Sequence, residues 1–168
     1  MASAGEPGER ITSRSADIGM DWQATAYPVE FYALGGQGTG IPVRASVSTF
    51  GPTLLSKVMG LNATQESSLG LVFHYADTKG LWLDTIPDLR AVVQFLTSPE
   101  GKADLKELGG LSSVTAGVIL RELVNFSAQG ADVFFGLPEF DTADLLRTAP
   151  DGRGLISMLE LPGVQDRP

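Results

Sequence analysis

The sequence contains no cysteine and a single histidine, His74, among its 168 residues. The absence of cysteine excludes a disulfide framework, an iron–sulfur cluster and a thiol nucleophile. One histidine excludes a multi-histidine metal site, although carboxylates alone could still hold a hard cation. Basic residues are also scarce, with 12 Lys and Arg against 20 Asp and Glu and a net charge of −8. This imbalance argues against free-standing nucleic-acid binding, which needs a basic surface for the phosphates.

Long apolar runs are missing as well. No run approaches the ~20 residues that a membrane span requires, and the start of the chain lacks the apolar core of a signal peptide. We therefore expect a cytoplasmic protein with no membrane partner. What the chain does contain is 43% hydrophobic residues, which is enough to build a core at this length.

Three segments have the character of β-strands. Val29–Leu34 and Val43–Thr49 alternate between apolar side chains and others, and the glycine-rich loop Gly35–Gly40 lies between them. We expect this loop to close an antiparallel β-ribbon, since glycines adopt the positive φ values of tight loops. Leu155–Leu161 is apolar on both faces, as strands at the centre of a covered sheet are. It pairs either with the ribbon or with strands that the sequence does not contain.

From Gly51 to about residue 150 the spacing of apolar residues is helical, and we expect about six helices. Asn62 followed by Gln65 has the pattern of a capping box. The predicted fold class is α+β and helix-rich, with an antiparallel β-ribbon, a bundle of about six helices and a terminal strand. The predicted organisation has four parts. Residues 1–16 are a flexible lead-in, and residues 17–50 are an irregular segment with the ribbon. Residues 51–150 are a helical subdomain, and residues 151–168 are a strand with a tail.

Two segments resemble parts of nucleotide-binding sites but depart from them. Gly35–Gly40 has the outer glycines of the phosphate-binding pattern G-x-x-x-x-G-K-[ST], yet Ile41 and Pro42 stand where the lysine and the hydroxyl residue are needed. The apolar run that ends at Glu160 resembles the acid-ended strand that holds Mg²⁺ in ATPases, but Ser157 interrupts it. We therefore assign no catalytic, cofactor-binding or metal-binding residue in this chain.

Two pairs of polar residues are weighed as candidates for function. Gln65 and Glu66 are candidates for a polar contact, although their place at the start of a helix favours capping and an interaction with the helix dipole. His74 and Asp77 have the spacing of a base and its orienting acid on a helix. No serine or threonine lies in a recognisable nucleophile elbow, so a surface role is favoured for this second pair.

Four apolar residues are candidates for an interface. Phe134 and Phe135 fit either an anchor in the core or an exposed interaction patch. Ile156 and Leu159 lie on the terminal strand, whose open edge would favour pairing with another chain.

Three long strings carry a resemblance to a known family: PVEFYALGGQGTGIPVRA, LNATQESSLGLVFHYAD and PDGRGLISMLEL. From about Glu9 to Leu161 the chain resembles the bacterial HerA-like helicase/ATPase family, which belongs to the FtsK–HerA group of P-loop NTPases. In that family the Walker A loop precedes the matched segment, and the Walker B strand, which ends in Asp-Glu, follows it. The resemblance therefore implies that this chain is the segment between the two, whose terminal strand belongs to the core sheet of the parent.

The resemblance also implies cofactors and partners. The parent is expected to bind ATP and Mg²⁺, to hydrolyse ATP, to form a homo-oligomer and to contact nucleic acid. The fragment itself is expected to hold no cofactor, to be inactive alone and to bind the rest of the ATPase core. Two alternatives stay open, a stand-alone non-enzymatic interaction module and a small hydrolase without an evident site. An exposed surface at Phe134 and Phe135 would favour the module.

Overall fold

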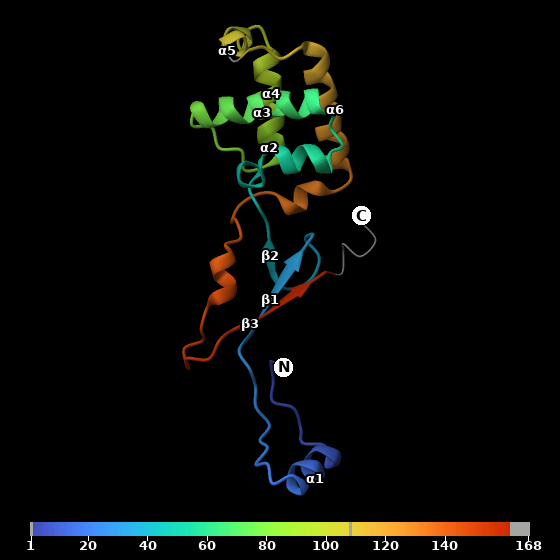
Figure 1. Ribbon diagram of the computed structural model, residues 1–168, viewed down its shortest axis with the longest axis vertical. Helices are drawn as coiled ribbons and strands as arrows, with labels where there is room; N and C mark the ends of the chain where they lie inside the picture. Colours follow the sequence, from blue (N-terminus) through green and yellow to red (C-terminus); the bar gives the residue numbers. More distant parts are fainter. Residues whose placement is uncertain (1, 108, 162–168) are drawn as a thin grey trace. The chain divides into compact units, whose positions relative to one another are not determined.

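The computed structural model describes residues 2–107 and 109–161. The chain divides into two compact units. The sheet unit comprises the described residues up to 42 and from 141 onward, and the helical unit is Val43–Phe140. Figure 1 shows the elements of both units in the colours of the sequence.

The sheet has three strands, β1 (Val29–Leu34), β2 (Ile41–Val43) and β3 (Ile156–Glu160), in the order β2-β1-β3. β1 and β3 are paired in parallel, from Val29 opposite Ile156 to Ala33 opposite Glu160. All three strands are parallel, so the antiparallel ribbon predicted from the sequence is wrong. The terminal strand pairs with β1, which is the first of the two alternatives considered for it.

The glycine-rich loop explains why no hairpin forms. A Cβ atom on Gly40 would lie only 2.7 Å from the backbone of Phe31 and 2.8 Å from that of Tyr32, beside the middle of β1 rather than its end. The chain has therefore travelled back along β1 before β2 begins. Gly35, Gly36 and Gly38 all have positive φ values, which allow this return within a short loop.

The predicted strand Val43–Thr49 is also wrong. β2 ends at Val43, and helix α2 (Val47–Val58) begins only a few residues later. The side chain of Ser46 accepts a hydrogen bond of 3.0 Å from the backbone N–H of Thr49 and so caps the first turn of α2, which is kinked at Gly51 (φ 79°, ψ 162°) just before Pro52. The capping interaction overrides the period-two alternation, because it satisfies a helix donor that would otherwise lack a partner.

The fold class is consequently α/β and helix-rich, with six α-helices and a parallel sheet in the part of the chain that is described. The helical unit contains α2, α3 (Ala63–Thr78), α4 (Ile86–Thr97), α5 (Lys102–Glu107), α6 (Ser113–Ala128) and the 3₁₀ helix η1 (Ala131–Phe134). The sheet unit adds α1 (Glu9–Asp17) and the 3₁₀ helix η2 (Thr142–Leu146). α1 lies in the predicted lead-in, where no helix was expected, and none of its residues is buried.

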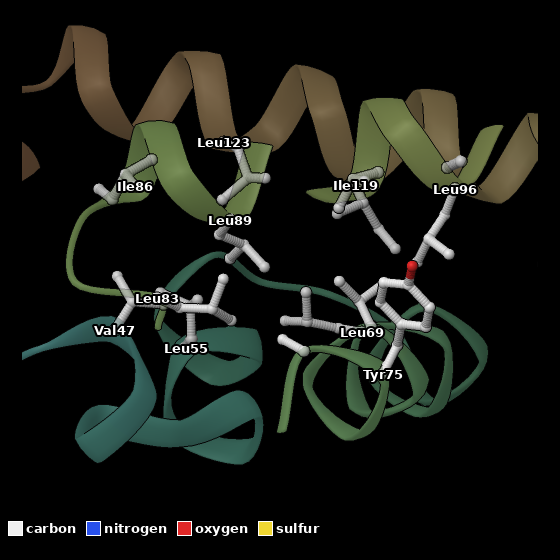
Figure 2. Packing of buried hydrophobic residues seen from close by; sticks show 14 of the residues in the cluster. Val47, Leu55, Leu69, Tyr75, Leu83, Ile86, Leu89, Leu96, Ile119 and Leu123 are labelled. Carbon is white, nitrogen blue, oxygen red and sulfur yellow. The ribbon is translucent and has the colours of Figure 1, made fainter. Parts of the chain in front are cut away.

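The helical unit has its own hydrophobic core. Figure 2 shows the side chains of α4 and α6 facing those of α2 and α3 across this core. Its fully buried large residues are Val47, Leu55, Leu69, Val72, Leu83, Ile86, Leu89, Val93, Leu96, Ile119 and Leu123. None of the described helices is long and apolar enough to span a membrane.

The two ends of the helical unit lie side by side. Ala45 and Phe135 form a parallel bridge, in which the Ala45 N–H donates to the carbonyl of Phe134 at 3.0 Å. The Phe140 N–H donates to the carbonyl of Arg44 at 2.9 Å. The helical unit is therefore closed where the chain enters it and leaves it.

Candidate functional site

The carboxyl edge of the sheet is the first candidate, because open parallel sheets bind ligands there. Since β1 and β3 are parallel, the loop Gly35–Gly40 and the side chain of Glu160 meet at this edge. The Thr39 N–H donates to Oε2 of Glu160 at 3.3 Å. Gly38 has a φ of 111°, and a Cβ atom there would lie 2.6 Å from the same oxygen. Only glycine fits at this position, and the carboxyl group of Glu160 lies against the loop.

This arrangement does not fit the phosphates of a nucleotide. The Glu160 carboxyl group already accepts a loop N–H, and a phosphate would compete with it for the same donor. The residues that follow the loop, Ile41 and Pro42, supply neither a cation nor a hydroxyl group. Among the described residues, no group of three or more metal-ligating side chains could hold a metal ion.

A second polar cluster joins β1 to the segment that follows η2. The Tyr32 hydroxyl donates to Oε2 of Glu30 at 2.5 Å, and Arg147 donates to the Tyr32 oxygen at 3.1 Å while it also pairs with Glu30. The hydrogen bond from Tyr32, followed by the one from Arg147, lowers the pKa of Glu30. The same contact with Glu30 and its desolvation raise the pKa of Tyr32. These shifts hold Glu30 ionised and Tyr32 neutral, which suits a structural tie rather than proton transfer at neutral pH.

The capping role considered for Gln65 is confirmed. The Gln65 N–H donates to the side-chain oxygen of Asn62 at 3.0 Å, and the Asn62 N–H donates to the side-chain oxygen of Gln65 at 3.0 Å. Glu66 lies in the first turn of α3, where an acidic side chain is favourable. A functional contact through Gln65 or Glu66 stays a prediction.

The two adjacent phenylalanines contribute to the core of the helical unit. Phe135 is buried, and its ring lies 5.4 Å from that of Phe50 and 6.2 Å from that of Phe126. Phe134 is half-buried and packs against the same cluster. This pair therefore does not form the exposed aromatic patch that would favour a stand-alone interaction module.

The interface candidates of the terminal strand lie on opposite faces of the sheet. Ile156 is half-buried and shares a face with Phe31 and Met158, which stand opposite each other in the register. Leu159 is exposed and stands opposite Tyr32 on the other face. An interface through Ile156 or Leu159 stays a prediction.

Two long-range contacts were not predicted from the sequence, although Glu160 itself was considered as the acid at the end of a strand. Glu160 and Arg147 contact residues more than a hundred positions away, and no local pattern announces such pairs. His74 and Asp77 do lie together, and they line a shallow groove of the helical unit that also involves Trp82. An exposed tryptophan between two leucines was the available signal for this groove.

Comparison with known proteins gives one match. The family model described as the helicase HerA-like C-terminal region matches residues 1–168. No curated protein and no solved structure matches the chain. The match spans the whole sequence and agrees with the resemblance carried by the three strings above. The chain belongs to the helicase HerA-like C-terminal family.

Proposed function

We propose that this chain is the segment of a HerA-like P-loop ATPase between the nucleotide-binding loop and the acid-ended strand. It supplies parallel strands to the core sheet, carries a helical unit inserted between them, and holds no nucleotide itself. The observation that carries this proposal is the parallel pairing of β1 with β3 across the intervening helical unit. Parallel strands joined by a long helical crossover are the arrangement of α/β sheets.

Exposed apolar side chains on the sheet support a place in a larger core. Parallel sheets are normally covered on both faces by other layers of the protein. Here Phe31 and Met158, which form a cross-strand pair, are 40% and 42% exposed. Further layers of the ATPase would cover this pair.

The closed ends of the helical unit support its description as an insertion. An inserted domain needs its two ends close together, so that the host fold is not disturbed. The bridge between Ala45 and Phe135 and the hydrogen bond between Phe140 and Arg44 meet this requirement. On this proposal the insertion contacts neighbouring subunits or partners of the ATPase.

ATP and Mg²⁺ belong to the parent in this proposal. The carboxyl edge of the sheet does not fit phosphate, because Glu160 lies against the glycine-rich loop and no lysine follows the loop. Any homo-oligomer and any nucleic-acid contact are likewise properties of the parent. The net charge of −8 favours placing the contact with nucleic acid elsewhere in the parent.

Hydrolysis of ATP by the purified chain tests the proposal. We expect no turnover, since phosphoryl transfer needs the lysine and the acidic pair that hold the phosphates and Mg²⁺. ATP turnover that is abolished by Gly38→Ala but preserved in Gly117→Ala would contradict the proposal. Gly38 tests the glycine-rich loop, because it lies against Glu160. Gly117 is the control, because it lies in open space on α6. The reading frame of the parent gives an independent test. The proposal requires a GK[ST] motif upstream of this segment and a strand ending in Asp-Glu downstream of it, and the lack of either would contradict it.

A further inference from the structure

The most exposed aromatic side chain of the helical unit is that of Trp82. It is 83% exposed and follows Leu81, which is 44% exposed. The next residue, Leu83, is 1% exposed and belongs to the core. A large apolar ring in water is unfavourable, and tryptophan is among the residues most often found at the centre of protein interfaces.

The segment that carries Trp82 is firmly anchored. The Ser48 N–H donates to the carbonyl of Leu83 at 2.9 Å, and the Leu83 N–H donates to the hydroxyl oxygen of Ser48 at 3.2 Å. On the other side, the Leu81 N–H donates to the carbonyl of Ala76 at 2.8 Å. Both neighbours of Trp82 are therefore fixed. This segment would lose little conformational freedom when a partner binds, so the entropic cost of binding at this segment would be small.

A shallow groove of about 450 Å³ lies beside this tryptophan. Its other side chains include the half-buried ring of Phe73, the imidazole of His74 and the carboxyl group of Asp77. Among the residues that the structure describes, no lysine or arginine lines it. Gly70 also lines it, and a Cβ atom there would meet nothing within 4 Å.

The charge of the groove is set by its acidic residue. The side chain of Asp77 has no hydrogen bond or ion pair in the part of the chain that the structure describes. Lys79, the residue that follows α3, instead pairs with Asp104 at 3.7 Å and lies over the ring of Tyr75. The Asp77 carboxyl group is thus available to a cation brought by a partner.

We propose that this groove binds an arginine side chain carried by an extended segment of a partner protein. A guanidinium group stacks on an indole ring and at the same time donates two hydrogen bonds to a carboxylate. Trp82 supplies the first contact and Asp77 the second, while Gly70 leaves room for the stem of the arginine. Lysine fits less well, because its ammonium group offers neither a planar face nor a paired donor.

Charge complementarity favours this occupant over others. The helical unit holds ten Asp and Glu against seven Lys and Arg, and this net charge of −3 opposes phosphate groups and acidic peptides and favours a basic partner. A second copy of the chain would bring the same negative charge to the contact. The inference does not depend on the proposed role in an ATPase, because it concerns only the helical unit.

Fluorescence of Trp82 provides the test. The chain has two tryptophans, so Trp22→Phe leaves Trp82 as the only reporter in the full-length protein. The probe is the blocked tripeptide Gly-Arg-Gly, compared with Gly-Lys-Gly and Gly-Glu-Gly. We expect a saturable change in emission with Gly-Arg-Gly, a weaker one with Gly-Lys-Gly and none with Gly-Glu-Gly.

Two variants sharpen the result. In the same background, Asp77→Asn should weaken the binding of Gly-Arg-Gly about five-fold, whereas Glu122→Gln on α6 should leave it unchanged. Circular dichroism confirms that each variant is folded. The proposal is overturned by the absence of a saturable change, by equal responses to the three peptides, or by unchanged affinity in a folded Asp77→Asn variant. Emission that depends on protein concentration without any peptide would also overturn it, since a second copy would then occupy the groove.

Discussion

The two units of the chain differ in where their stability comes from. The helical unit buries nearly all of the apolar side chains that are fully removed from solvent. In the sheet unit, the buried hydrophobic residues within the described part are Tyr32 and Ala33. The helical unit can therefore be stable from its own core, whereas the sheet unit buries few apolar side chains and exposes others, such as Phe31 and Met158.

Polar contacts hold the sheet unit together instead. The backbone pairing of β1 with β3 is supported by the cluster of Glu30, Tyr32 and Arg147. Arg153 pairs with Asp151 and also donates to the backbone carbonyl of Ala26 at 2.7 Å. These ties fix the segment that leads into β3 but bury little apolar area.

The largest effect should come from the core of the helical unit. Leu89→Ala removes a fully buried side chain and leaves a cavity, so it should lower the free energy of unfolding by about 2–5 kcal/mol. Leu54→Ala is the matched control, because Leu54 is 53% exposed and should cost less than about 1 kcal/mol. Urea unfolding followed by circular dichroism measures both values. Equal losses in the two variants would show that the helical unit lacks the core described above.

The part of the fold that follows from local chemistry was predictable. β1 was predicted with its observed bounds, and β3 was predicted within one residue at each end. The capping box of Asn62 and Gln65 was also predicted from residue types and spacing. In each case the signal lies within a few consecutive residues, where backbone preference and side-chain hydrogen bonds act directly.

The direction of strand pairing was not predictable in the same way. Alternation in Val43–Thr49 indicated a strand, but the hydroxyl of Ser46 caps a helix there. The return of the chain at Gly40 depends on its close approach to Phe31, and such an approach leaves no trace in a local pattern. The contact of Glu160 with Thr39 is likewise long-range, so the carboxyl edge could not be assembled from the sequence.

A smaller effect is expected at the start of α2. Ser46→Ala removes the acceptor for the Thr49 N–H and one donor to Glu139, so the free energy of unfolding should fall by about 1 kcal/mol. Ser46→Asp can still accept the capping hydrogen bond but places a second acid beside Glu139. It should therefore restore less stability than Ser46→Thr does. If Ser46→Thr lowered the free energy of unfolding as much as Ser46→Ala does, the capping role of Ser46 would be contradicted.

Acid should weaken the same end of the helical unit. The backbone N–H of Ser46, followed by the side chain of Thr49, lowers the pKa of Glu139 from its ordinary value of 4.5. Because the folded-state pKa is the lower one, this carboxylate stabilises the fold above pH 4.5 and loses that contribution as the pH falls through the folded-state value.

The pH dependence is measured with Glu139→Gln. Since Glu139 is exposed, the variant should lose less than about 1 kcal/mol at neutral pH. The difference from the natural chain should shrink as the pH is lowered below 4.5. Unfolding curves recorded across this range test the sign. A difference that grows on acidification would contradict the lowered pKa.

The smallest change in stability is expected on the exposed face of the sheet. Met158→Lys replaces a side chain that is 42% exposed, so the free energy of unfolding should change by no more than about 0.5 kcal/mol. The substitution should nevertheless reduce the binding of an apolar dye, because it interrupts the apolar pair with Phe31. Val114→Lys on α6 is the control for added charge, since Val114 is 77% exposed and lies in the helical unit. If Met158→Lys instead cost several kcal/mol, the chain would already cover this face, and the contrast between the two units would fail.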